Sequence, residues 1–238
     1  MDIRCRWAVV LAMLLFMAFT AFGCGMQTGD KSEKSAAELA AEGMQFFEKK
    51  KYAKAIDTFQ GLKEWYPFDE LAIMAEQKIP ESHYRMAAYE DAVFGFAEFE
   101  RLHPTHPNLP EVIYLMGMCY YDRMDAVDRD PSSARTAFET FARLKGRFPE
   151  AANGFDVDEK IKKCREHLAA HEMYVGRFYF KTKHYQSALG RFETILRSYP
   201  DVTMFQKEAG EYVIQCNDAI AASESIPDGA DAEKVISQ

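Results

Sequence analysis

His167 and His171 are the pair whose spacing best suits metal binding, because residues four apart lie on one face of a helix. The sequence places no third ligand nearby, and no zinc-protease motif surrounds the pair. We therefore expect both imidazoles on a solvated helix face, with a metal site as the alternative. His103 and His106 flank a proline-containing turn, where turn residues are expected rather than ligands.

Other signs of catalysis are missing from the sequence. It contains no glycine-rich phosphate loop, no paired CxxC motif and no Gly-x-Ser-x-Gly elbow. Acidic pairs such as Glu98 and Glu100 fall on helix faces that should be exposed. The sequence therefore predicts a protein that is not an enzyme and that needs no cofactor and no metal.

Cys24 is the residue for which the sequence predicts a covalent modification. Arg4 and Arg6 precede an uncharged, almost wholly apolar run over residues 7–23. A small residue before a cysteine, here Gly23, is typical of a bacterial lipoprotein signal peptide, in which the cysteine thiol takes the lipid. The alternative is an uncleaved membrane anchor, since 17 residues are at the lower limit for a spanning helix.

The signal-peptide interpretation divides the chain into four parts. They are a signal peptide (1–23), a flexible tether (24–35), a folded domain (36–222) and a mobile tail rich in Ser, Pro, Gly and Asp (223–238). Gly25, rather than aspartate, follows Cys24. Bacterial lipoprotein sorting then implies a lipid-anchored protein on the periplasmic face of the outer membrane.

The composition argues against nucleic acid as a partner. The net charge of the 238 residues is −8, and no basic stripe is present to neutralise phosphates, so nucleic acid is not expected.

The cysteines after residue 24 are three in number. Cys119, Cys164 and Cys216 fall in helical patterns, and three cysteines cannot all pair with one another. We expect buried free thiols, while a disulfide between two of them stays open.

One five-residue pattern recurs three times at identical spacing, with apolar residues at +3, +4 and +3 and a closing proline at +5. The copies are Tyr52, Ala55, Phe59, Leu62 and Pro67; Tyr89, Ala92, Phe96, Phe99 and Pro104; Tyr185, Ala188, Phe192, Ile195 and Pro200. Gly43 and Gly176 precede the alanines of two copies by twelve residues. Apolar residues on one helix face, opposite a small residue on an earlier helix, are typical of tetratricopeptide repeats, which have about 34 residues each. An all-α superhelix of helix-turn-helix units is predicted.

Two repeats depart from this pattern. In repeat 2, Pro80 stands where the small residue is expected and should kink or delay its helix. In repeat 3 we align Ala134, Phe138 and Phe141 with the pattern, which puts five extra residues in the turn and makes the second helix about one turn longer. A long helix over residues 157–181 opens repeat 4, and a helix over residues 204–222 should cap the stack.

The first helices of the repeats should line a groove. The aligned repeats place aromatic rings at one groove position, namely Phe47, Tyr84, Tyr121 and Phe180. Methionine and tyrosine side chains at neighbouring positions are Met44, Tyr114, Met118 and Met173, and the cations at the rim are Arg85, Arg177 and Lys181. Such a surface suits a peptide with aromatic residues and a negative group. The alternative is that these side chains pack between adjacent repeats.

Three segments between the repeats carry a more specific resemblance. They are His103-Pro104-Thr105-His106-Pro107-Asn108; Asp128-Arg129-Asp130-Pro131; and Leu168-Ala169 through Tyr179 to Tyr199-Pro200. Through them the chain resembles the BamD (ComL) family over residues 36–220. These are lipoprotein subunits of the machine that folds β-barrels into the bacterial outer membrane.

The resemblance implies partners and a docking residue. The C-terminal half would dock on the periplasmic domains of the barrel insertase subunit, beside other lipoproteins of the machine, and the N-terminal repeats would receive the C-terminal targeting sequences of unfolded barrel proteins. The family's insertase-contacting arginine corresponds to Arg191, for which the alternative is a solvated side chain or a pair with Glu193. The other function considered is a tetratricopeptide envelope lipoprotein that serves pilus assembly or peptidoglycan-linked processes.

Overall fold

The computed structural model describes residues 34–224. This part of the chain is helical and contains no strand, which confirms the predicted fold class. The helices are α2 (Ala36–Glu48), α3 (Tyr52–Trp65), α4 (Glu70–Arg85), α5 (Tyr89–Leu102), α6 (Leu109–Tyr121), α7 (Ser132–Arg147), α8 (Pro149–Gly154), α9 (Val157–Lys181), α10 (Tyr185–Ser198) and α11 (Thr203–Glu224). Cys24, the expected signal peptide, residues 24–33 of the expected tether and residues 225–238 of the expected tail lie outside the described residues.

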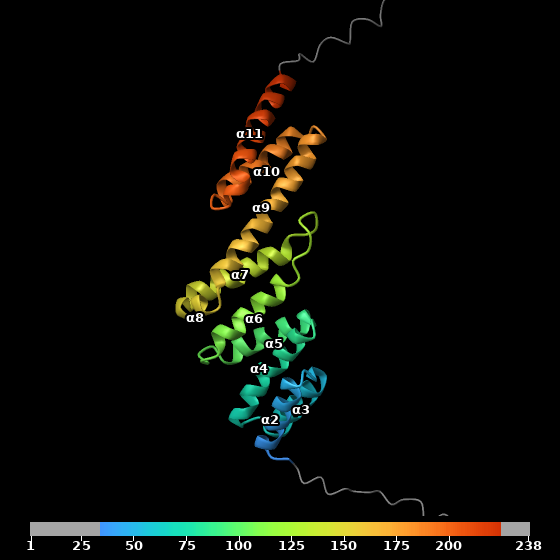
Figure 1. Ribbon diagram of the computed structural model, residues 1–238, viewed down its shortest axis with the longest axis vertical. Coiled ribbons are helices and arrows are strands. Elements are labelled where there is room, and N and C mark those ends of the chain that lie inside the picture. Colours follow the sequence, from blue (N-terminus) through green and yellow to red (C-terminus); the bar gives the residue numbers. More distant parts are fainter. Residues whose placement is uncertain (1–33, 225–238) are drawn as a thin grey trace, which may run out of the picture.

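The helices form an elongated stack that follows the order of the chain (Figure 1). The pairs α2–α3, α4–α5, α6–α7 and α9–α10 are the four repeats, and each second helix also packs on the helix that follows it. The last helix, α11, packs on α10 and on α9, in the capping position expected for it. No helix in the described part of the chain has the length and apolar character needed to cross a membrane.

Close contact between a glycine and a phenylalanine joins the two helices of three repeats. A Cβ atom placed on Gly43 would lie 2.5 Å from the ring of Phe59, and one on Gly176 would lie 2.6 Å from Phe192. Both phenylalanines are fully buried. The small residue is therefore required, because any side chain would occupy the volume of the ring.

The structure corrects the predicted alignment of repeat 3. Gly117 faces Phe141, with 2.6 Å between its would-be Cβ and the ring, whereas Phe138 is only partly buried. The residues that occupy the pattern are Ala134, Ala137, Phe141, Leu144 and Pro149, at the same spacing as in the other repeats. The pattern itself is not lengthened, and the additional residues all lie in the turn before α7.

Pro80 does not delay its helix, so that part of the prediction is wrong. The helix α4 runs from Glu70 to Arg85 with Pro80 inside it. Pro80 faces Gly95 of α5, where an added Cβ atom would lie 2.7 Å from the Cβ atom of the proline. The small residue of this repeat has thus moved to the second helix, which makes room for the pyrrolidine ring.

Three repeats share one turn geometry between their helices. Lys50, Ala87 and Lys183 have φ angles of 57°, 58° and 62°, in the left-handed region. At the first of these turns, the N–H of Lys51 donates to the carbonyl of Phe46 and the N–H of Lys50 to that of Phe47. This is a Schellman motif, which usually has glycine at the left-handed position.

The two histidines at metal-ligand spacing are partly buried, and each is held by a backbone carbonyl rather than only by solvent. His167 Nε2 lies 2.7 Å from the carbonyl oxygen of Asp125, and His171 Nδ1 lies 2.7 Å from that of Val127. Each imidazole N–H donates to a backbone carbonyl, which holds the loop between α6 and α7 against α9. Within residues 34–224 no group of three His, Cys, Asp or Glu side chains is placed to hold a metal ion.

Candidate functional site

Three of the predicted groove aromatics, Phe47, Tyr84 and Tyr121, lie at the C-terminal ends of the first helices α2, α4 and α6; we call them the aromatic row. Each ring is partly buried. Phe47 packs edge-on against Tyr52, with 5.5 Å between ring centroids, and Tyr84 lies 6.1 Å from Tyr89. Each of these two rings therefore packs on the first residue of the next helix and keeps part of its surface open.

Each ring of the aromatic row also meets a polar side chain from the next repeat. The three contacts are Lys78 Nζ at 5.1 Å from the Phe47 ring centroid, Asp122 Oδ2 at 2.7 Å from the Tyr84 hydroxyl, and Lys160 Nζ at 4.7 Å from the Tyr121 ring centroid. Burial and the hydrogen bond donated to Asp122 raise the pKa of Tyr84 above its ordinary value. The row therefore combines apolar contact with stacking between repeats.

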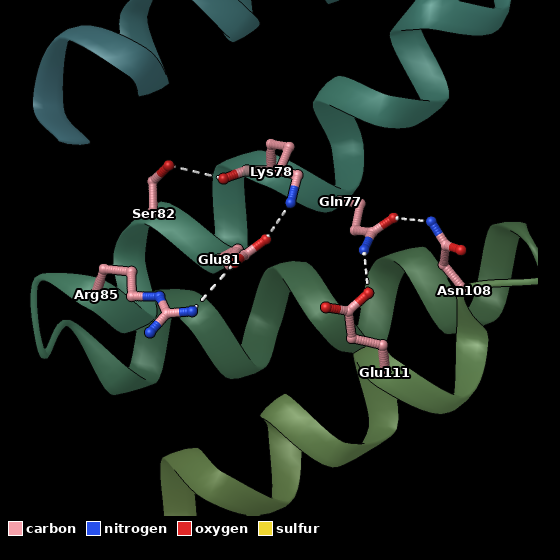
Figure 2. A network of polar contacts seen from close by, with 7 residues as sticks. All are labelled: Gln77, Lys78, Glu81, Ser82, Arg85, Asn108 and Glu111. Carbon is pink, nitrogen blue, oxygen red and sulfur yellow. Dashed lines mark hydrogen bonds and ion pairs between the residues drawn. The ribbon is translucent and has the colours of Figure 1, made fainter. Parts of the chain in front are cut away.

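A buried carboxylate lies beside the row, between two cations of the same helix (Figure 2). Glu81, whose side chain is 6% exposed, accepts from Lys78 Nζ at 2.6 Å and from Arg85 Nη2 at 3.4 Å. The Arg85 guanidinium carbon lies 5.7 Å from the Tyr84 ring centroid. Arg85 is the more exposed cation, at 47%, and it is the one placed to meet an anion from outside.

Gln77 connects repeat 2 to repeat 3, and sequence reasoning missed it. Its amide nitrogen donates to Glu111 Oε2 at 3.3 Å, and its amide oxygen accepts from Asn108 Nδ2 at 2.9 Å (Figure 2). Gln77 is 3% exposed. A glutamine within a helix carries no signal of such a role until its neighbours in space are known.

Other predicted groove residues pack on the core of repeat 1 or contact the capping helix. Met44 is partly buried and packs on the core of repeat 1. Phe180 lies 5.0 Å from Tyr212 of α11, measured between ring centroids. Arg177, expected at the rim, pairs with Glu208 of α11, with Nε 2.9 Å from Oε1. The capping helix thus contacts Phe180 and Arg177 in the part of the predicted surface that belongs to repeat 4.

Arg191, on α10, lies at a separate cavity of about 430 Å³. The cavity is lined by Glu172, Tyr179, Gln186, Ser187, Gly190, Arg191 and Thr194. Arg191 Nη1 lies 3.1 Å from Oε2 of Glu172, so its partner is a residue of α9 and not the Glu193 considered from sequence. The Arg191 side chain is 42% exposed and that of Glu172 is 11% exposed. The guanidinium therefore retains donors that face the cavity.

Burial determines the protonation state of two thiols in the core. Cys119, Cys164 and Cys216 are free and buried. Burial raises the pKa of both Cys119 and Cys164 to about 12. These thiols are protonated at neutral pH and take the part of small apolar groups.

Comparison with known proteins places the chain in a family. A family model described as an outer membrane lipoprotein, YfiO, matches residues 32–229. The outer membrane protein assembly factor BamD of Rickettsia prowazekii is 31% identical over 197 residues, which cover 80% of this chain and 76% of that protein. The BamD of Neisseria gonorrhoeae is 28% identical over 207 residues, covering 80% and 77%.

A solved thermophilic TPR protein from Thermus thermophilus is also similar, with 10% identity and a TM-score of 0.41 over 76% of this chain and 100% of its own. The family match includes every helix described above, from α2 to α11. The chain belongs to the YfiO (BamD) family of outer membrane lipoproteins.

Proposed function

We propose that the chain is a non-enzymatic scaffold that assists the folding and insertion of outer-membrane β-barrel proteins. The observation that carries this proposal is the family match over the whole repeat stack, together with curated relatives named outer membrane protein assembly factor. At both candidate sites a partly exposed arginine, Arg85 or Arg191, can donate to a partner as well as to its own glutamate.

The cavity at Arg191 is the proposed docking point for the barrel insertase subunit. Arg191 is held by Glu172 on one side and open to the cavity on the other. An acidic side chain of the insertase's periplasmic domains would accept from the free donors of the guanidinium, whose planar shape suits two parallel bonds to a carboxylate.

Charge reversal at Arg191 tests this docking. The Arg191→Glu variant should lose most of the insertase in affinity purification from detergent extracts, because attraction becomes repulsion. Arg197→Glu, an exposed site on the same helix, is the matched control and should keep normal co-purification. Equal recovery of the insertase with both variants, at equal expression, would place the docking site elsewhere.

The aromatic row and Met44 are the proposed site for C-terminal targeting peptides of unfolded barrel proteins. Partly open rings provide contact area, and Arg85 provides a cation for the peptide carboxylate. Truncation of a contact aromatic costs on the order of 2 kcal/mol, or roughly thirtyfold in affinity. Phe47→Ala and Tyr84→Ala should each weaken peptide binding to this extent.

The matched control for the peptide experiment is Phe178→Ala, which removes a ring that is 57% exposed on α9. Circular dichroism should show that all three variants keep their helicity. Peptide affinity that is unchanged in Phe47→Ala and Tyr84→Ala would mean that these rings serve only to pack the repeats.

Lipid attachment at Cys24 is proposed to hold the stack at the periplasmic face of the outer membrane. A single acyl chain binds membranes only marginally, so the several chains of a bacterial lipoprotein give firm anchoring. Cys24→Ser should leave an uncleaved precursor in the inner membrane. Mature protein in the outer-membrane fraction of this variant would contradict the proposed anchor.

A further inference from the structure

Repeats 2 and 4 carry cavities at the same place in the repeat. The cavity of repeat 2 has a volume of about 280 Å³ and lies between α3 and α5 over α4. Equivalent positions are found by counting from the packing pair, which is Pro80 and Phe96 in repeat 2 and Gly176 and Phe192 in repeat 4. The equivalent lining residues are Glu76 and Glu172, His83 and Tyr179, Asp91 and Ser187, Phe94 and Gly190, Gly95 and Arg191, and Glu98 and Thr194.

The two cavities differ in how their shared glutamate is paired. In repeat 4 Glu172 receives Arg191 from the second helix of its own repeat, at 3.1 Å. In repeat 2 glycine stands at the arginine position, because a side chain on Gly95 would collide with Pro80. Repeat 2 therefore has no arginine at the position of Arg191, and Glu76 lines the cavity.

The lining of this wall carries more carboxylates than cations. It contains three carboxylates, Glu76, Asp91 and Glu98, one ammonium group, Lys63, and the imidazole of His83, which lies 4.0 Å from Asp91. Glu98 is already paired with Arg101 of the same helix, whose Nε lies 3.0 Å from Oε2. Lys63 Nζ lies 3.6 Å from Glu76, and His103 Nε2 lies 2.6 Å from the same carboxylate. The Asp91 side chain is 71% exposed. A cation that entered the cavity would meet carboxylates from α4 and from α5.

Apolar side chains stand at the cavity mouth. Phe94 is 77% exposed and Leu102 is 46% exposed, and both line the cavity. The arginine side chain has an apolar stem and a planar charged head, and the head stacks on aromatic rings. Phe94 offers a face for the stem, while the acidic wall offers acceptors for the head.

We propose that this cavity binds an arginine side chain presented by a partner protein. The guest guanidinium takes the position that Arg191 holds in repeat 4, and it donates to the carboxylates of Glu76 and Asp91, with Glu98 adding negative charge nearby. The inference is separate from docking at Arg191, where this chain supplies the cation. Here the partner supplies the cation and this chain supplies the acidic site.

The test uses a pair of capped peptides and the full mature protein in detergent. The probes are acetyl-Leu-Arg-Leu-amide and the same peptide with citrulline, which has nearly the shape of arginine but no charge. Backbone amide NMR signals of Phe94 and Gly95 report binding at the cavity. We expect the arginine peptide to shift these signals and to bind about tenfold more tightly than the citrulline peptide, because only arginine carries the charge that the carboxylates attract. This difference corresponds to about 1.4 kcal/mol of binding free energy. Equal affinity, or no shift with either peptide, would overturn the proposal.

Two variants locate the effect within the cavity. Asp91→Asn with Glu98→Gln should weaken arginine-peptide binding at least about threefold, since exposed ion pairs contribute less than buried ones. The matched control is Glu139→Gln with Glu193→Gln, which removes two carboxylates from repeats 3 and 4 and should bind as the parent protein does. Loss of binding in the control alone, or in neither, would contradict the proposed site.

A third variant converts repeat 2 to the arrangement of repeat 4. Pro80→Gly with Gly95→Arg exchanges the two small-residue positions and lets the chain supply its own arginine to Glu76. The variant should no longer bind the arginine peptide, with helicity checked by circular dichroism. Retained binding would argue against the equivalence of the two cavities. If this variant does not fold, the carboxylate variants still decide the question.

Discussion

Pro80 and Gly95 face each other across repeat 2, with only 2.7 Å between the Cβ atom of the proline and a Cβ atom placed on the glycine. Gly95→Ala should therefore destabilise the fold by about 1–3 kcal/mol, as overpacking of a core contact does. Chemical denaturation measures the change. Gly61→Ala is the matched control, because no atom lies within 4 Å of a Cβ at this helical position. It should raise stability by about 0.5–1 kcal/mol. Equal effects of the two changes would contradict the packing described here.

The turn residues in the left-handed backbone conformation allow a second prediction. Ala87 has a φ angle of 58°, a conformation that costs an L-residue roughly 1 kcal/mol and glycine almost nothing. Ala87→Gly should stabilise the protein by about 0.5 kcal/mol. The gain is less than the full strain energy because glycine also increases the conformational entropy of the unfolded chain. Ala97→Gly, at an exposed position within α5, should instead destabilise by about 1 kcal/mol. Thermal unfolding of both variants distinguishes the turn from the helix, and a loss of stability in both would refute the assignment.

The pair formed by Arg191 and Glu172 should be coupled energetically. Arg191→Met leaves a carboxylate that is 11% exposed without its partner, which should cost about 1–3 kcal/mol. Glu172→Gln removes the charge that needs a partner, so the double variant should lose less than the sum of the single losses. A double-mutant cycle by urea denaturation should give a coupling of at least about 0.5 kcal/mol. Additive effects would show that the two side chains do not act as a pair.

The buried thiols predict sensitivity to alkaline pH. The folded-state pKa of Cys119 and of Cys164 is raised from 9.0 to about 12, so the folded state keeps its thiol protons where the unfolded state loses them. Their contribution to stability is fully present below pH 9 and is lost as pH rises towards 12. In the double variant Cys119→Ala with Cys164→Ala, the free energy of unfolding should therefore decrease less steeply between pH 9 and pH 12 than in the parent protein. An unchanged slope would contradict this, although Tyr84 and Tyr114 add to it with the same sign.

The spacing of apolar residues predicted most of the fold because the same helix contact recurs. Phe59, Phe96 and Phe192 are each fully buried at the expected positions, and the long helix α9 has the expected bounds. The alignment failed in repeat 3, where Ala134 and Ala137 offer two alanines and Phe138 and Phe141 two phenylalanines, three residues apart. Pro149 distinguishes them, because it lies five residues after Leu144, as the closing prolines of the other repeats do.

The sites were less predictable than the fold. The partner of Arg191 lies 19 residues earlier on another helix, and nothing in the local sequence distinguishes Glu172 from the adjacent Glu193 as its partner. The histidines of α9 had ligand spacing, but their role depends on carbonyls of a loop more than 40 residues away. Schellman turns were missed because lysine and alanine stand where glycine is the usual signal.

A chain that assists the folding of outer-membrane β-barrels should affect how much barrel protein folds in the cell. The most direct experiment depletes the protein in its own cell and measures the folded fraction of newly made barrel proteins. Folded barrels are recognised because they resist unfolding in cold SDS. The folded fraction should fall before growth slows, and re-expression of the parent chain should restore it while Arg191→Glu restores it less. A folded fraction that stays unchanged after depletion would contradict the proposed function.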